Sequence, residues 1–544
     1  MREKLISHFK SRKLDLLVIF FAFIFSTFLY WKTLYIKDNQ MFIATKVWSD
    51  FGATLPVARS FSYGFNFPPQ YPHFAHEPIR YHFLFYLFVG LLEKYGIRLD
   101  YALNTLSAIG MTLLIYFIYK GGEVLFKNKV IGILSLLFFI FNGSFGFLEY
   151  FKANGINISS ILQIPSNQNF TSFGPYDEKI VSAFWSLNIY TNQRHLALGY
   201  AIFLGIFLYL YHRIVKHKSI SYNAALIIGI LVGFIPFLHL AVYAMIGVAV
   251  LLFFLIFSHT RKQLFLMGFV AIILALPQFI YMGSSRVESE LIKIGYLAKN
   301  ISEIPYYWLL NLGLLIVFIP IGFLLANKNQ KKAFLVFLTF FIIANTFRLS
   351  PEIAANHKFI NMFVIGMNWF LAFSIITLWG KFLMSKLILT ISILFLTLTG
   401  IIDLFPIIND KYVTIDDIPK NKIANFIDKN TTKDAIFLNS SFTFHPALIA
   451  GRKIFLGWPY YAWSAGYDTD HRNKIFTKMY TSTNKFDFCK MAIENNIDYV
   501  TVEDTKGDTN LPTINTEFFK NNFKLMYEDI KENYFIFSIK DNCA

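Results

Sequence analysis

The sequence from Trp48 to His82, WSDFGATLPVARSFSYGFNFPPQYPHFAHEPIRYH, is polar and lies between two strongly apolar segments. It is interrupted by several prolines, each of which lacks the backbone N–H that a helix needs. Because lipid would leave the freed carbonyl groups without partners, this stretch cannot cross a membrane as a helix. We therefore expect a long loop at a membrane face. It carries these ionisable side chains: Asp50, Arg59, His73, His76, Glu77, Arg80 and His82.

The composition indicates a protein with many membrane spans. Of the 544 residues, 55% are hydrophobic and only 15% are charged, against about 25% charged residues in soluble domains. The net charge of +16 comes largely from Lys and Arg in short loops between apolar runs. The positive-inside rule and anionic lipid headgroups favour this pattern, so we expect the lipid bilayer as a partner and no nucleic acid.

Apolar runs predict about 11 to 13 spans. The first run, from Leu14 to Tyr35, is too long for a signal peptide, and the basic head before it predicts a cytoplasmic N-terminus. The run from Tyr81 to Tyr95 is too short to cross fully, because crossing takes about 20 residues. The remaining spans are expected near residues 101–119, 130–147, 195–211, 222–238, 240–257, 264–282, 306–325, 333–344, 360–379 and 387–402.

Short basic loops set the orientation of these spans. The loops at 212–218, 259–263, 327–332 and 380–386 are rich in Lys and Arg and should be cytoplasmic. The loops between them, and everything after Asp403, then lie outside. We expect a multi-pass protein of the plasma membrane with a cytoplasmic N-terminus and an extracytoplasmic C-terminal part.

The composition changes near residue 404. Residues 1–403 form the expected multi-spanning domain, with 37–80 as its first extracytoplasmic loop. In residues 404–544 short β-like runs alternate with helical patterns, which predicts a small α/β domain outside the membrane. This part contains no GxGxxG and no Walker A motif. Its two cysteines, Cys489 and Cys543, could pair there or remain free thiols.

The outside loops bring ionisable groups to one face, and such groups at membrane level often mark a functional cavity. Cations such as Arg80 and Arg348 could hold a phosphate, while a carboxylate could take a proton from a hydroxyl. Simpler interpretations stay open: Asp50 could be a solvated helix residue or cap, and His239 a packing histidine. A metal on His73, His76, His82 and Glu77 is a further possibility, but their spacing matches no tight zinc motif.

The arrangement resembles the GT-C membrane glycosyltransferases. The resemblance rests on the basic N-terminus, one span, the loop quoted above with its early acid, further spans, and an outer α/β domain. The segments NQRHLALGYAIFL and NHKFINMF are also similar to members of this group. The resemblance implies that Asp50 is a general base and Glu149 a second catalytic acid, with Arg194 and Lys358 near a donor phosphate.

Two departures from that group affect what we expect. No acid adjoins Asp50 in the first loop, and no WWDxG-type signature occurs. The first departure gives no grounds to assign a metal ligand, although a divalent metal stays possible. The second argues against block transfer of an oligosaccharide to asparagine.

The resulting hypothesis is an inverting glycosyltransferase. It would move a sugar from a polyprenyl-phosphate donor to the hydroxyl of an extracytoplasmic glycan, lipid or protein acceptor. One alternative is a transporter or flippase of lipid-linked saccharides; another is a non-catalytic membrane protein whose outer domain binds a partner. Besides the catalytic Asp50 and Glu149, the expected substrate-binding residues are Arg59, His76, Arg80, His82, Arg194, His195, His239, Arg348, His357 and Lys358.

Overall fold

The computed structural model describes residues 2–172, 182–283, 290–503 and 510–543. The chain folds into two compact units. Unit 1 contains residues 1–33, 104–278 and 290–411, and unit 2 contains residues 34–103, 279–289 and 412–544. The first long loop is therefore grouped with the C-terminal part of the chain in unit 2.

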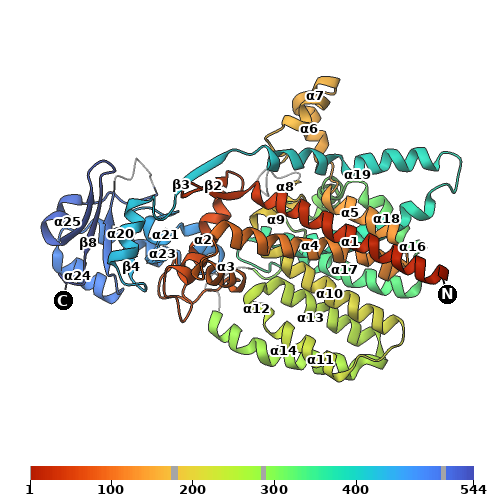
Figure 1. Ribbon diagram of the computed structural model, residues 1–544, viewed down its shortest axis with the longest axis horizontal. Coiled ribbons are helices and arrows are strands. Elements are labelled where there is room, and N and C mark those ends of the chain that lie inside the picture. The colour runs from red at the N-terminus through yellow and green to blue at the C-terminus, as the bar shows by residue number, and fades with distance from the viewer. Residues whose placement is uncertain (1, 173–181, 284–289, 504–509, 544) are drawn as a thin grey trace. The chain divides into compact units, whose positions relative to one another are not determined.

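Long helices dominate unit 1 (Figure 1). Among the described residues, six helical segments are long and apolar enough to cross a membrane, which agrees with a multi-spanning protein. They contain α1 (Arg2–Trp31), α4 (Leu99–Phe126), α10 (Leu196–Val215), α14 (Arg261–Met282), α18 (His357–Leu378) and α19 (Ser385–Ile408).

Shorter helices complete this unit. A seventh apolar segment is broken, because α15 (Ile304–Leu312) and α16 (Leu315–Leu325) meet at an angle of 86°. The remaining helices are α5 (Lys129–Ile140), α6 (Gly146–Asn154), α7 (Ile158–Gln163), α8 (Ser182–Trp185), α9 (Asn188–Asn192), α11 (Tyr222–Gly233), α12 (Ile235–Leu238), α13 (Leu240–Ile256) and α17 (Lys328–Thr346).

Helix α18 lies at the centre of unit 1 and packs against α5, α16 and α17. Its Trp369 is fully buried, and the indole N–H donates to the carbonyl of Ile118 in α4 at 2.7 Å. A Cβ on Gly121 would lie only 2.0 Å from the Trp369 ring, so glycine lets α4 approach α18 closely. Small residues serve the same purpose in other membrane bundles, where packing rather than hydrophobic burial joins the helices.

Unit 2 contains a three-stranded antiparallel sheet in the order β1–β2–β3. The strands β1 (Leu34–Lys37) and β2 (Gln40–Ala44) follow the first long helix, whereas β3 (Tyr412–Asp416) follows the last one. Gln40 pairs with Asp416 and Ala44 with Tyr412, so the sheet joins segments that are far apart in sequence. Helices α2 (Trp48–Ser62) and α3 (Leu84–Lys94) complete this part and pack against each other.

The rest of unit 2 is a small α/β fold, as the alternating pattern predicted. Its five-stranded sheet has the order β5 (Lys453–Ile454), β4 (Ile436–Leu438), β6 (Tyr499–Val502), β8 (Tyr534–Ser538) and β7 (Lys524–Asp529). The first three strands are parallel and the last two pair antiparallel. The helices are α20 (Lys422–Asn430), α21 (Pro446–Ile449), α22 (Pro459–Ser464), α23 (Thr469–Tyr480), α24 (Lys485–Glu494) and α25 (Thr516–Asn522).

The two cysteines form a disulfide. Cys489 in α24 is bonded to Cys543, which lies 54 residues later, and their Cα atoms are 5.2 Å apart. The bond fastens the end of the chain to a helix of the small α/β fold. The sequence left open whether these cysteines are paired or free, and in the structure they are paired.

Candidate active site

Asp50 lies in the first turn of α2, where the partial positive charge of the helix end favours a negative side chain. Its side chain is partly buried. The neighbouring residue, Ser49, accepts a hydrogen bond through its carbonyl from the hydroxyl of Tyr461 in α22, at 2.6 Å. Burial raises the pKa of Tyr461 to about 12, and the charge of Asp50 acts in the same direction. This carboxylate is thus placed beside a neutral phenol of the C-terminal segment.

The loop after α2 is held by hydrogen bonds to α2 itself and to the C-terminal segment. Nε2–H of the buried His73 donates to the carbonyl of Gly52 at 2.9 Å, and burial lowers the pKa of this histidine to about 4. Nε2 of His76 lies 2.8 Å from the carbonyl oxygen of Asn495. His76, which was predicted to bind substrate, and its neighbour His73 therefore both have hydrogen-bond partners within unit 2.

Arg80 is also engaged by unit 2. Its guanidinium donates to the carbonyl of Gly466 at 2.7 Å and to the carboxylate of Glu77 at 2.9 Å, and it lies over the ring of Tyr467. His82 is buried two residues later. These contacts hold the loop as an ordered segment of unit 2.

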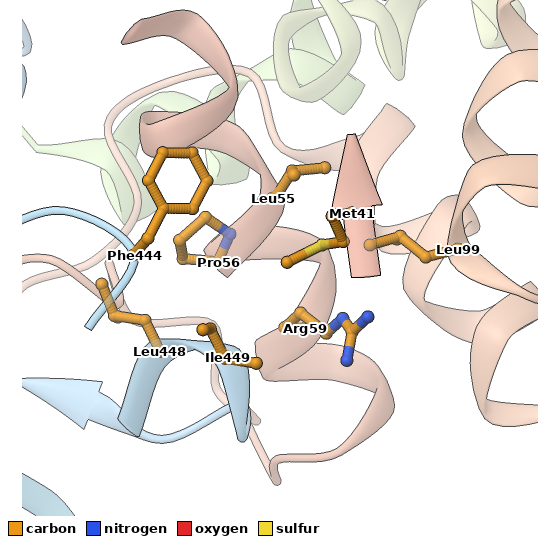
Figure 2. Close-up of a pocket in the computed structure, with 8 residues that line it drawn as sticks. All are labelled: Met41, Leu55, Pro56, Arg59, Leu99, Phe444, Leu448 and Ile449. Atoms are coloured by element: carbon orange, nitrogen blue, oxygen red, sulfur yellow. The ribbon is translucent and has the colours of Figure 1, made fainter. Parts of the chain in front are cut away.

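Arg59 forms a buried ion triad. Its Nη2 lies 2.6 Å from a carboxylate oxygen of Asp417 and 3.2 Å from one of Glu93. Arg59 also lines the small apolar cavity in Figure 2, together with Met41 and Leu99. That cavity has a volume of ≈ 10 Å³, about enough for a single water molecule, so it is too small for a sugar. The contacts of Arg59 are those of a residue that joins segments of unit 2.

In unit 1, three helix N-termini meet at one group of basic side chains. His195 directly precedes α10, His239 stands between α12 and α13, and His357 and Lys358 begin α18. We call these four residues the basic cluster. Each helix N-terminus carries a partial positive charge, which is an arrangement that suits an anion.

Side-chain contacts tie the basic cluster together. The rings of His195 and His239 have centroids 5.1 Å apart, and the charge of Lys358 acts on both and on His357. The amide nitrogens of Gln193 and Asn361 lie 3.3 Å from the two ring nitrogens of His357. All four members are buried. The structure therefore brings together four of the residues that the sequence proposed for substrate binding.

Arg194 adjoins this cluster in sequence but points into the protein. Its guanidinium donates to the carbonyl of Thr191, to Oδ1 of Asn104 and to the hydroxyl of Thr33, and it covers the ring of Tyr30. These contacts fasten the start of α10 to α1 and α4. Arg194 is completely buried, and its contacts are those of a residue that stabilises the packing of these helices.

The last two predicted residues lie elsewhere in unit 1. Glu149 is a partly exposed residue of α6 and lies 3.8 Å from Nζ of Lys152. Arg348 follows α17, and its backbone N–H donates to the carbonyl of Leu291.

The sequence interpretation missed Tyr461, Tyr467 and Arg472. Arg472 donates to the carbonyls of Ala75 and Phe455, and burial lowers its pKa to about 10. All three residues belong to the aromatic stretch 451–472, whose density of Trp, Tyr and Arg was the available signal. That stretch could not be assigned to the first loop, because nothing local in a sequence reports a contact almost 400 residues away.

Comparison with known proteins identifies the fold. No protein-family model and no curated protein sequence matches the chain. Among solved structures, it is similar to ArnT from Cupriavidus metallidurans, with a TM-score of 0.50 and 10% identity over 99% of both chains. It is also similar to the arabinofuranosyltransferase AftD from Mycobacteria, with a TM-score of 0.54 and 11% identity over 97% of this chain and 40% of that one. At this identity the likeness establishes the fold alone, and this chain has the fold of the GT-C membrane glycosyltransferases.

Proposed function

We propose that this chain is an inverting membrane glycosyltransferase that uses a polyprenyl-phosphate-linked sugar. The observation that carries the proposal is the basic cluster. Lys358 and the N-termini of α10, α13 and α18 offer positive charge for a phosphate at the end of a helical membrane unit. The basic loops at 212–218 and 380–386 lie at the opposite ends of α10 and α18, so the positive-inside rule puts the cluster outside.

The reaction would proceed as a single displacement. Asp50 takes the proton of the acceptor hydroxyl while the hydroxyl oxygen attacks the anomeric carbon of the donor sugar. The bond between that carbon and the lipid phosphate breaks, its electron pair stays on the phosphate oxygen, and the configuration inverts. Lys358 and the helix ends stabilise the charge that grows on the departing phosphate. Because a lipid phosphate is a good leaving group, no strong general acid is needed.

The acceptor would be recognised by unit 2. Tyr460 and Trp463 of α22 are partly exposed, with ring centroids 6.1 Å apart, and their helix is fastened beside Asp50 through Tyr461. Flat aromatic faces suit the apolar faces of sugar rings, which favours a saccharide among the acceptors considered.

A transfer assay tests the proposal. Membranes that contain the full chain are supplied with labelled polyprenyl-phosphate sugars, and transfer of label to water-soluble or lipid acceptors is followed. Asp50→Asn should reduce transfer by about 10²–10⁴-fold, the usual contribution of a general base. The matched control is Asp38→Asn, which removes an exposed carboxylate from the β1–β2 turn of the same unit.

The outcomes separate the hypotheses. Equal transfer by wild type and Asp50→Asn would remove Asp50 from the mechanism. Movement of the labelled lipid across the membrane without any sugar transfer would instead support the transporter. Since the proposed site neutralises the phosphate with Lys358 and helix ends, we expect transfer to persist in EDTA; loss in EDTA with recovery on adding Mg²⁺ or Mn²⁺ would require a metal in the mechanism.

A further inference from the structure

Helices α6 and α7 stand apart from the other helices of unit 1 (Figure 1). We call residues 146–163 the α6–α7 hairpin. It is fastened to the last membrane helix at its start, where the backbone N–H of Phe147 donates to the hydroxyl of Thr399 at 3.0 Å. After the hairpin, the carbonyls of Pro165 and Asn167 accept hydrogen bonds from the side chain of Asn409. The start of the α6–α7 hairpin and the residues that follow it are thus hydrogen-bonded to the C-terminal part of α19.

Polar contacts hold the hairpin together from within. The hydroxyl of Tyr150 in α6 donates to the carbonyl of Ser160 in α7, at 2.9 Å. The Ser160 hydroxyl donates to the carbonyl of Asn154, and the side chain of Asn157 caps the start of α7. These bonds fix the two short helices against each other, although neither is long enough to be stable alone in water.

The apolar side chains of the hairpin point outward. Ile156, Ile158, Ile161 and Leu162 are exposed by 90%, 77%, 55% and 74%. The last three occupy positions i, i+3 and i+4 of α7, so they share one helix face. The buried Ser160 lies on the opposite face. A water-soluble helix hairpin would have the reverse arrangement, with its apolar face inside.

The attachment points fix the depth of this face. Thr399 and Asn409 are ten positions apart, which corresponds to about 15 Å along a helix. Asn409 ends α19 and begins the polar run Asn409–Asp410–Lys411, whereas Thr399 lies inside the apolar span. The hairpin therefore leaves the bundle between the end of a membrane span and its interior. At that depth the surroundings of the unit are the headgroup and upper acyl region of a bilayer.

We propose that the α6–α7 hairpin is an interfacial membrane anchor whose apolar face of Ile158, Ile161 and Leu162 lies in the lipid. The occupant is the bilayer of the bundle itself, because Phe147 at the start of the hairpin stacks on Phe395 of α19, and Phe395 and Leu394 of that membrane helix are themselves exposed. The exposed Lys152 can direct its charge to lipid phosphates while its stem lies along apolar groups. This inference does not depend on the transferase reaction.

Site-directed fluorescence tests the anchor. Ile161→Cys in the full chain is labelled with the environment-sensitive dye NBD and reconstituted in vesicles, since the native cysteines are consumed in their disulfide. Its emission should be shifted to the blue, and lipids with a doxyl group near the carbonyl should quench it several-fold more strongly than aqueous iodide does. Ile158→Cys, on the same face, provides a second label should the first variant fold poorly.

The control is Gln163→Cys, an exposed position on the same helix but away from the apolar face. Its label should be quenched mainly by iodide. Equal quenching by iodide at residues 161 and 163 would overturn the proposal. A label at residue 161 that neither agent quenches, combined with disulfide cross-linking between chains of the unlabelled Ile161→Cys variant, would also overturn it and would assign the face to a second copy.

Discussion

Lys358 carries the positive charge on which the proposed donor site depends. Its side chain is buried at the start of α18, where its charge acts on His195, His239 and His357. Lys358→Met should lower kcat/KM for the lipid-linked donor by about 10²-fold, comparable to removing one oxyanion donor. Lys358→Arg, which keeps the charge, should recover part of that loss. The measurement is the transfer assay at varied donor concentration.

The control for Lys358 is Lys381→Met, an exposed lysine at the other end of the same helix region. It removes the same charge without touching the basic cluster, so its kcat/KM should match wild type. If both variants were equally impaired, the loss would reflect the charge of the whole protein, and the phosphate role of Lys358 would be withdrawn.

His73 should make the folded state sensitive to acid. Burial lowers its pKa from 6.5 to about 4. Between these pH values the unfolded chain binds a proton that the folded chain does not, so stability falls as the pH falls through this window. The loss amounts to about 3 kcal/mol at one pKa unit per 1.36 kcal/mol. Thermal unfolding of the purified chain at pH 7 and pH 4.5 measures it. His73→Gln keeps an N–H donor but cannot titrate, so a variant as acid-sensitive as wild type would assign the effect to other groups.

Arg59 should stabilise unit 2 rather than bind substrate. Removing it leaves the carboxylates of Glu93 and Asp417 buried near each other, and breaking a buried ion pair in this way costs about 3–5 kcal/mol. Arg59→Met should therefore lower the unfolding temperature of the chain. Burial raises the pKa of Glu93, so the deficit should shrink as the pH falls and this carboxyl group takes up a proton. The triple variant with Glu93→Gln and Asp417→Asn should recover stability; an unchanged deficit in it would show that the charges are not the cause.

At the scale of elements, composition and length predict the spans but not what the loops do. The expected spans at 195–211, 222–238, 240–257 and 387–402 fall on α10, on α11 with α12, on α13 and on α19, because lipid demands apolar runs of a given length. Helices α10 and α19 extend beyond their expected runs, since helical hydrogen bonding continues into water where hydrophobicity stops. The apolar run 81–95, predicted too short to cross, contains α3, which packs on α2 in unit 2.

The pairing of strands that are far apart in the chain could not be predicted from the sequence. The strand runs around Ile436, Tyr499 and Tyr534 are local patterns of branched and aromatic residues, and the corresponding strands form. The sheet β1–β2–β3 pairs Gln40 with Asp416, and no periodicity reports a register between such distant segments. For the same reason the sequence could not predict that the basic cluster forms. His195, His239 and Lys358 were each proposed from their own loops, but only the folded bundle brings them together at three helix starts. Asp50 and Glu149 as catalytic acids stay predictions.

At the scale of the whole molecule, the disulfide and the basic loops both bear on orientation. Disulfides persist in oxidising compartments and are rare in the cytosol, so Cys489–Cys543 argues that unit 2 is extracytoplasmic. The Lys- and Arg-rich loop 327–332 of unit 1 should then face the cytoplasm.

A cysteine at the exposed Asn473 of α23 should react with a membrane-impermeant maleimide on intact cells. A cysteine at the exposed Lys328 should react only after the cells are opened. The native pair supplies no background while it stays oxidised. Protection at residue 473 together with labelling at residue 328 on intact cells would show that the protein has the opposite orientation in the membrane. The proposed donor would then have to be replaced by one presented on the cytoplasmic side, because its phosphate must reach the basic cluster.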